Sequence, residues 1–388
     1  MSSSESLSHR TDHDARLTLQ RAARQNLNRP PHAGPEVRIL EAHNTNLSPD
    51  MTKQQEQPNL FVRCMRKIFH PLGFTKGYNF GLFAAFFLAM FIFCLVRSPY
   101  LNIGGSAKSS FASGAAPGEW YWYRSGIYRV GITMHLAAVI PAGILMVWQF
   151  LPVLRRGCVL FHRINGFIIY ALITVGNIGG LLIARRTFGG ATSVQAAVGL
   201  LAVITWISMS LAWYNIRRLQ IEQHRAWMLR MAFYLGTIIT TRLIVPIAAV
   251  FVSRGVYHTV WSCDELSFYY TDDPSQLTIN YPACNITDYV AIQATFMTGR
   301  AENIGAALQI NFGMALWVAI FIHTIGVEIY LNLTPREAER LRVISHQRQL
   351  AAGFKNPGSA GLTVDRWGDA DPWMPPFEEK SPEKTSSS

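Results

Sequence analysis

Six long apolar stretches interrupt an otherwise polar chain, and each is near the ~20 residues that a helix needs to cross a bilayer. They run over residues 78–96, 127–151, 164–184, 194–214, 228–252 and 308–331. A helix is suited to this role because it satisfies its backbone hydrogen bonds internally, as lipid requires. The pattern therefore predicts an all-α integral membrane protein with about six transmembrane helices, in a membrane domain over residues 78–332.

The two ends of the chain differ from this middle. Residues 1–59 and the part after about residue 351 are polar and rich in Ser, Gly and Pro, so they cannot bury enough apolar surface to fold alone. Residues 60–77 alternate basic and apolar side chains at a helical period, which predicts an interfacial amphipathic segment with Cys64 as a candidate for palmitoylation. We predict a disordered tail over 1–59 and a second tail over 333–388. With no cleavable signal peptide, the first span is expected to act as a signal anchor.

Lysine and arginine are unevenly distributed about the spans. If the amino terminus is inside, the inner flanks carry about twice as many of them as the outer flanks, as cytoplasmic connections do. Both termini are therefore predicted to be cytoplasmic and the connection 253–307 extracytoplasmic. In that connection we expect a Cys263–Cys284 disulfide and an N-glycan on Asn285, features of an oxidising compartment. The expected location is a eukaryotic endomembrane or plasma membrane, with the acceptor triplets at positions 46 and 332 unmodified.

Composition narrows the partners. The net charge is +11 and half of the residues are hydrophobic, but the basic residues are spread along the membrane flanks and the tails. Anionic lipid headgroups and the bilayer itself are the expected partners, and no nucleic acid is expected. Cys64, Cys94 and Cys158 lack metal-ligand spacing, so no metal site is predicted.

Polar residues inside the spans are costly and mark candidate sites. At 1.5 Å per residue, His135 and Arg242 lie ~13 Å and ~15 Å below the outer ends of their spans, and so at matching depth. Gln149 shares a helical face with His135, whereas Tyr170 and Asn177 lie on one stripe of the third span. These residues form the predicted membrane polar site. None of the six spans offers a carboxylate at the level of Arg242, so a bound anion, a heme propionate, a water-filled cavity or backbone carbonyls should supply its partner.

Two histidines suggest a cofactor. His162 and His224 both begin spans on the cytoplasmic side, and each is followed by an arginine, Arg163 and Arg225. Their similar depth would let both imidazoles ligate one b-type heme, with the arginines near its propionates. The fourth span contains no histidine, so the usual arrangement of four histidines and two hemes is not expected.

The stretch 129–246 resembles a family of membrane proteins of bacteria and fungi known as domain of unknown function 2306. The matching pieces are Met134-His135-Leu136, Gln149-Phe150-Leu151, His162-Arg163-Ile164-Asn165-Gly166, Phe188-Gly189-Gly190 and His224-Arg225-Ala226-Trp227-Met228-Leu229-Arg230, followed by Arg242. The resemblance implies a four-helix core made by spans two to five. It brings no established activity, and Phe167 stands where the family usually has an arginine.

Three functions follow from these features. The first is a redox protein that passes electrons across the membrane through a heme held by His162 and His224. The second is a small-molecule or ion transporter with a cavity lined by His135, Arg242, Tyr170 and Asn177. The third is a non-catalytic membrane anchor or assembly factor. The heme hypothesis ranks first because two imidazoles at equal depth permit it, whereas no internal repeat supports transport. Whether the protein is an enzyme stays open.

Overall fold

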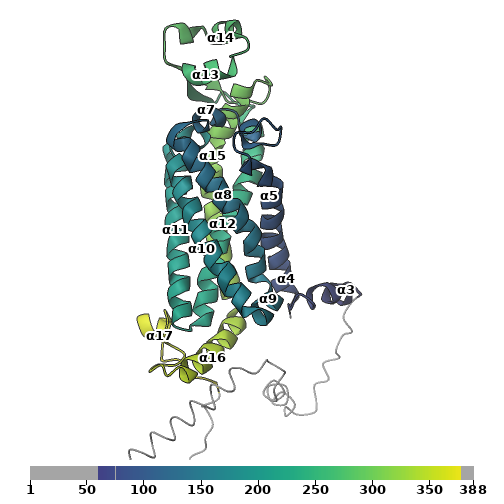
Figure 1. Cartoon of the computed structure of the whole chain (residues 1–388), viewed down its shortest axis with the longest axis vertical. Helices are drawn as coiled ribbons and strands as arrows, with labels where there is room; N and C mark the ends of the chain where they lie inside the picture. The colour runs from purple at the N-terminus through teal and green to yellow at the C-terminus, as the bar shows by residue number, and fades with distance from the viewer. Residues whose placement is uncertain (1–59, 75, 377–388) are drawn as a thin grey trace, which may run out of the picture.

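The computed structural model describes residues 60–74 and 76–376, and its long helices run side by side along one axis (Figure 1). Within these residues, six helical segments are long and apolar enough to cross a membrane: Gly77–Leu101, Gly126–Phe150, Val159–Ile183, Thr192–Arg217, Ile221–Val252 and Ala301–Asn332. The prediction of an all-α protein with six spans is confirmed. The predicted tail over 1–59 lies outside the described residues, as do residues 377–388.

In chain order the elements are α3 (Leu60–Phe69), α4 (Gly77–Phe83), the π-helical turn η1 (Ala84–Leu88), α5 (Ala89–Arg97), η2 (Ser98–Leu101), α6 (Phe111–Gly114), α7 (Glu119–Tyr123), α8 (Gly126–Phe150), α9 (Pro152–Gly157), α10 (Val159–Ile183), η3 (Thr187–Gly190), α11 (Thr192–Arg217), α12 (Ile221–Val252), β1 (His258–Ser262), α13 (Cys263–Tyr269), α14 (Pro274–Asn280), η4 (Pro282–Asn285), β2 (Tyr289–Gln293), α15 (Ala301–Asn332), α16 (Pro335–Ala351) and α17 (Val364–Trp367). The first span therefore comprises α4, η1, α5 and η2. The other five spans are single helices.

Two spans begin about two helical turns earlier than the hydrophobic pattern predicts. α12 and α15 each start with a polar turn, and protein contacts hold that turn in place. Glu222 accepts a hydrogen bond from the Ser345 hydroxyl at 2.8 Å, and Glu302 accepts one from the Tyr270 hydroxyl at 2.7 Å. Because these carboxylates are satisfied outside the apolar stretch, the helices extend past it.

Helix packing in the bundle follows small residues and aromatic rings. α8 packs closely along α10, where a Cβ on Gly179 would lie 2.6 Å from the backbone nitrogen of His135. Small residues at such a crossing let two membrane helices approach. Stacked aromatic rings join the first span to the bundle: the ring centres of Phe86 and of Phe233 on α12 are 4.4 Å apart. α15 packs along α12 and against α11, so the sixth span is an integral part of the bundle.

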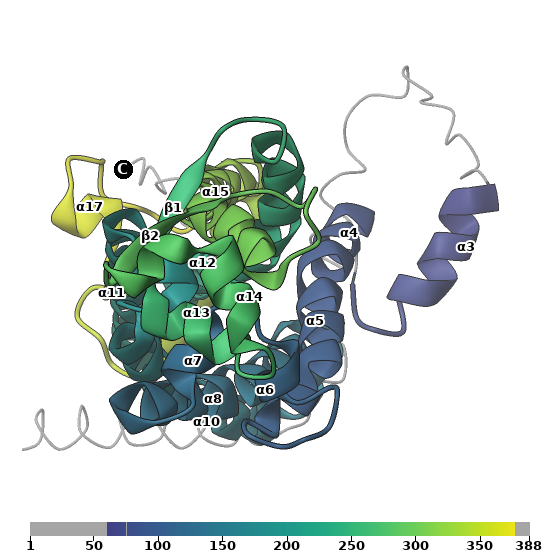
Figure 2. The same cartoon turned by 90° about the horizontal axis from the view of Figure 1, so that it is seen from above.

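The connection Ser253–Arg300 folds into a small cap, and we call its side of the bundle the loop end (Figures 1 and 2). β1 and β2 pair antiparallel, and Trp261, Leu266 and Ile292 are buried beneath them. A disulfide joins Cys263 to Cys284, as the sequence predicts. A covalent link across this connection restricts its unfolded state and stabilises the cap.

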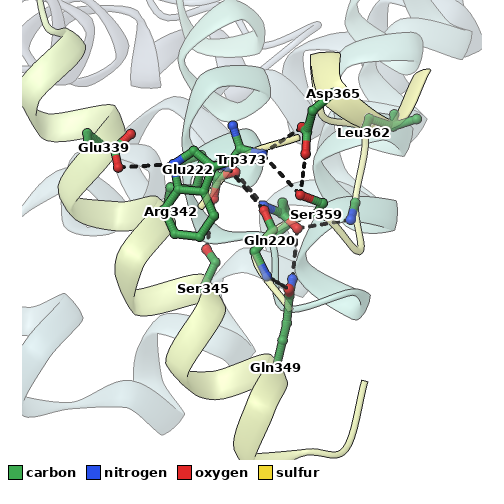
Figure 3. Close-up of polar contacts among 12 residues, drawn as sticks. Gln220, Glu222, Glu339, Arg342, Ser345, Gln349, Ser359, Leu362, Asp365 and Trp373 are labelled. Atoms are coloured by element: carbon green, nitrogen blue, oxygen red, sulfur yellow. Dashed lines mark hydrogen bonds and ion pairs between the residues drawn. The ribbon is translucent and has the colours of Figure 1, made fainter. Parts of the chain in front are cut away.

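The opposite side, which we call the α16 end, corrects one prediction. Disorder was expected after about residue 351, but residues 352–376 pack against the bases of α11 and α12 (Figure 3). Arg342 forms an ion pair with Asp365 at 2.6 Å, and Gln220 donates to the Gly358 carbonyl at 2.8 Å. Gln349 accepts a hydrogen bond from the Gly358 N–H and donates one to Gln220. Buried amide side chains thus satisfy the backbone of a segment whose composition alone suggests disorder.

Candidate functional site

Arg242 lies in the loop half of α12, ~15 Å before the end of that helix at Val252. Its guanidinium carbon is 4.8 Å from the ring centre of Phe188 and 5.8 Å from that of Phe312. Within the described residues, no oxygen accepts a hydrogen bond from this guanidinium and no carboxylate forms an ion pair with it. The residue is nevertheless accessible, although it lies deep among protein atoms. We call this accessible place around the Arg242 guanidinium the hollow.

The turn η3 forms one wall of this hollow. Phe188 has a φ of 45° there, while Gly189 and Gly190 have φ of 79° and 65°, in the left-handed region that favours glycine. A Cβ on Gly190 would lie 1.8 Å from the backbone oxygen of Arg185, so no larger residue fits. The turn stacks Phe188 on Phe312 of α15, with ring centres 4.0 Å apart and planes 6° from parallel.

The short helix α7 places a carboxyl group beside the same turn. Glu119 is only 7% exposed, and its Oε1 accepts a hydrogen bond from the Phe188 N–H at 2.9 Å. Burial raises the pKa of Glu119 to about 7, against the opposing effects of the Phe188 N–H, the Arg242 charge and the Tyr123 hydroxyl. Glu119 therefore supplies a counter-charge to Arg242 without bonding to it, and it titrates near neutral pH.

This carboxylate corrects an expectation from the sequence. None of the six spans carries an acidic residue at the level of Arg242, so the partner was expected to come from outside the side chains of the bundle. Glu119 instead reaches the site from the connection between the first two spans. The available signal was a single acidic residue ahead of the aromatic run 120–123, a run typical of the membrane interface.

A second buried carboxyl group lies close to the start of α7. Glu265 of α13 accepts a hydrogen bond from the indole of Trp122 at 3.2 Å, and burial raises its pKa to about 7. The charge of Glu119 adds to this rise. Glu265 and Trp122 line a cavity of about 120 Å³ with seven other residues: Arg186, Gly189, Val260, Trp261, Ser262, Tyr289 and Gln309.

His135 is held between α8 and α10 near Arg242. Its Nδ1 lies 2.8 Å from the carbonyl oxygen of Gly176, to which it donates. Arg242 is near enough to act electrostatically on His135, as the shared depth of the two residues predicts. The imidazole thus braces two helices beside the hollow.

The other three residues of the predicted membrane polar site do not join this hollow. Gln149 donates to the backbone carbonyl of His162 at 2.9 Å, which places it in the α16 half. Tyr170 is 39% exposed on the outer surface of α10. Asn177 has a buried side-chain nitrogen without a hydrogen-bond partner among the described residues. Sequence spacing put these residues on shared stripes, but a stripe alone does not determine which helix faces it.

Arg97, a residue that the sequence analysis did not select, lies near Arg242. Its guanidinium donates to the Tyr100 hydroxyl at 2.7 Å and lies over the Tyr100 ring at 4.9 Å. Tyr100 in turn donates to the Gly114 carbonyl. The hollow therefore has two guanidinium groups near it, one already bonded and one free.

His162 of α10 and His224 of α12 come near each other at the α16 end, within range for an electrostatic interaction. The Nδ1 of His224 donates to the Ala212 carbonyl at 2.9 Å, which orients the ring and leaves Nε2 available. The Nδ1 of His162 is buried and has no hydrogen-bond partner among the described residues. Two imidazoles in this relation are a suitable donor set for one heme iron.

The arginines predicted beside this pair lie differently. Arg163 is exposed, whereas Arg225 reaches the hydroxyl groups of Tyr330 and Thr334, at 3.5 and 3.4 Å. Arg155 of α9, which the sequence analysis did not select, is the arginine that acts on both histidines. In the part of the chain that the structure describes, no group of three or more His, Cys, Asp or Glu residues is arranged to hold a metal ion.

An apolar core separates the histidine pair from the hollow at Arg242. Ile169 and Ile173 of α10, Met209 of α11 and Met231 of α12 are buried together between the two levels.

Residues 132–263 match DUF2306, a family described as predicted membrane proteins. The resemblance found in the sequence is confirmed. The DUF2306 match contains both histidines, Arg242 and the turn η3, and Glu119 lies before it.

One curated relative extends beyond this match. Ava biosynthesis cluster protein G of Aspergillus versicolor is 23% identical over 317 aligned positions, which include 67% of this chain and 90% of that protein. No solved structure matches the chain.

Proposed function

We propose that this protein is a membrane-embedded small-molecule binding protein that serves a biosynthetic pathway. The observation that carries the proposal is the accessible guanidinium of Arg242, which meets no acceptor among the described residues although it lies within the bundle. A charged group at that depth is costly, and such groups usually mark a ligand or ion path. The name of the fungal relative, a biosynthesis cluster protein, supports the choice of a biosynthetic role.

Disruption of the gene in its native organism tests this function. The small-molecule profile of the organism is expected to change, and the wild-type chain should restore it. Arg242→Met should not restore it, because this variant removes the unpaired guanidinium that would bind a polar ligand. Leu243→Met is the matched control, since Leu243 is 64% exposed on the bundle surface and should be replaceable. An unchanged profile after disruption, or full rescue by Arg242→Met, would refute the role.

The histidine pair supports a second candidate function, binding of a b-type heme. His162 and His224 would supply the axial ligands, and the unsatisfied Nδ1 of His162 gives a reason for a bound group at that place. A heme bound there would supply one-electron transfer. The absorption spectrum of the purified protein, reduced minus oxidised, should show a Soret band that disappears in His162→Ala and His224→Ala but persists in His135→Ala. No band after heme-replete expression removes this candidate.

We also propose the orientation that the basic residues predict, with the loop end outside the cytoplasm. Asn285 lies exposed at the end of η4, accessible for modification. Asn332 is at the opposite end of the bundle, and Asn46 lies outside the described residues. The glycan on Asn285 remains a prediction that peptide mass mapping tests.

Contact of α3 with anionic headgroups is a further proposal about the α16 end. α3 extends away from the bundle and across its axis (Figures 1 and 2). Its last turn carries Arg66 and Lys67, and Ile68 is 50% exposed beside them. Such a helix suits the surface of a membrane rather than its interior.

A further inference from the structure

The donors of Arg242 are free to bind a group from outside the chain. A guanidinium presents five N–H donors in a planar fork, and none of those of Arg242 meets an acceptor among the described residues. Glu119 does not fill this role, because no hydrogen bond or ion pair joins it to Arg242; its Oε1 accepts from the Phe188 N–H instead. The fork matches a carboxylate, which accepts two parallel hydrogen bonds from it.

The charges near the hollow indicate the sign of that group. Arg97 lies near Arg242, and Glu119 provides the opposing charge. Above pH 7, where Glu119 is ionised, two guanidinium groups against one carboxylate leave a single positive charge to be balanced. A monoanion therefore suits the hollow better than a dianion, and a cation is repelled.

The surfaces around Arg242 indicate an apolar body for the ligand. The buried rings of Phe188 and Phe312 stand beneath the guanidinium and support it, so the ligand meets the other apolar surfaces around Arg242. On α12, Pro246 follows Arg242 by one turn on the same side and is exposed. The hollow thus borders the lipid-facing surface of α12, and a molecule dissolved in the bilayer can reach it without crossing water.

We propose that the hollow at Arg242 binds the carboxylate of a membrane-soluble organic acid, whose apolar body extends past the exposed Pro246 toward the bilayer. The proposal rests on the small-molecule function above and adds the class of ligand. A fatty acid of the membrane and an acidic biosynthetic product share this chemistry.

A ligand series with one tail and three headgroups tests the proposal. The full-length protein in lipid nanodiscs is titrated with decanoate, decanol and decylamine while its thermal unfolding midpoint is measured. Decanoate should bind at least about tenfold more tightly than decanol, the preference expected for a charge-assisted fork. Arg242→Met should lose this preference and Leu243→Met should keep it. Arg242→Lys, which retains the charge without the fork, should keep only part of it.

The outcomes separate the ligand class from the function. If decanol or decylamine binds the wild type as tightly as decanoate, or if Arg242→Met keeps the preference for decanoate, the proposed class is overturned. The metabolite profile judges the small-molecule function independently. A rigid aromatic acid, 4-biphenylcarboxylate, distinguishes the sources: tighter binding of decanoate indicates a lipid acid, and tighter binding of the aromatic acid indicates a biosynthetic product.

Discussion

Two arginines on α12 have opposite surroundings. Arg230, in the α16 half, forms a bidentate pair with Glu328 of α15, with distances of 2.6 and 2.9 Å. Arg242, about three turns further along the same helix, makes no hydrogen bond or ion pair within the described residues. The nearest counter-charge, Glu119, is bonded elsewhere. The chain therefore contains the means to neutralise an arginine in this helix and does so at only one of the two positions.

The two arginines therefore have different roles. A paired guanidinium such as Arg230 fixes α12 against α15, and its free energy of interaction is used within the fold. An unpaired one keeps its hydrogen-bonding capacity for another partner. Cation–π contact with Phe188 and Phe312 compensates Arg242 in part, because such contacts are worth about 0.5–2 kcal/mol. The remainder of the cost is what a bound anion would offset.

The largest expected effect comes from the turn that supports Arg242. Gly190→Ala should lower the free energy of unfolding by about 4 kcal/mol, from left-handed strain and from the clash with the Arg185 oxygen. It should also weaken ligand binding, since Phe188 would move. Gly199→Ala is the control, because a Cβ there meets no atom within 4 Å and α11 gains a better helix former. Titration with SDS in mixed micelles measures both variants, and equal stabilities would contradict this account of the turn.

The next effect concerns Glu119 and pH. Its folded pKa of about 7 exceeds its ordinary value, so the folded state binds the proton more tightly and stability falls as pH rises toward 7. The groups that act on it are Arg242, Tyr123, Glu265 and Tyr269. Between pH 5 and 8 the free energy of unfolding of the wild type should fall by about 3 kcal/mol more than that of Glu119→Gln, whose side chain does not titrate. Parallel pH profiles of the two proteins would show that Glu119 does not titrate in this range.

The smallest effect compares the two arginines directly. Arg230→Met leaves Glu328 without its partner. Because that carboxylate is partly exposed, the free energy of unfolding should fall by only about 1–2 kcal/mol. Arg242→Met removes an unpaired charge and should cost nothing or stabilise the bundle. Unfolding in mixed micelles, without added acid, tests both. A larger loss for Arg242→Met than for Arg230→Met would mean that Arg242 has a structural partner within the protein.

The sequence predicted what depends on local physics. Six spans follow from hydrophobic length, and the common depth of His135 and Arg242 follows from the fixed rise of a helix. The Cys263–Cys284 disulfide was also predicted, from the compartment of its connection, and it is present.

What the sequence did not predict depends on contacts between distant segments. Glu119 lies in a short connection without periodicity, and its place ahead of an aromatic run indicated a membrane interface but no approach to Arg242. The order of residues 352–376 depends on Gln220, whose amide bonds to Gly358 and Gly361 more than a hundred positions away. Likewise, Tyr170 shares a stripe with inward residues but faces outward, because the rotation of α10 is set by its packing on α8.

Native mass spectrometry of the protein from its own membranes tests the central claim, that Arg242 is left unpaired for an acidic ligand. The wild type should carry a bound molecule that is released as an anion, and Arg230→Met should carry it as well. Arg242→Met should be free of it. Retention of the same molecule by Arg242→Met, or a wild type that carries no acidic molecule, would contradict the claim.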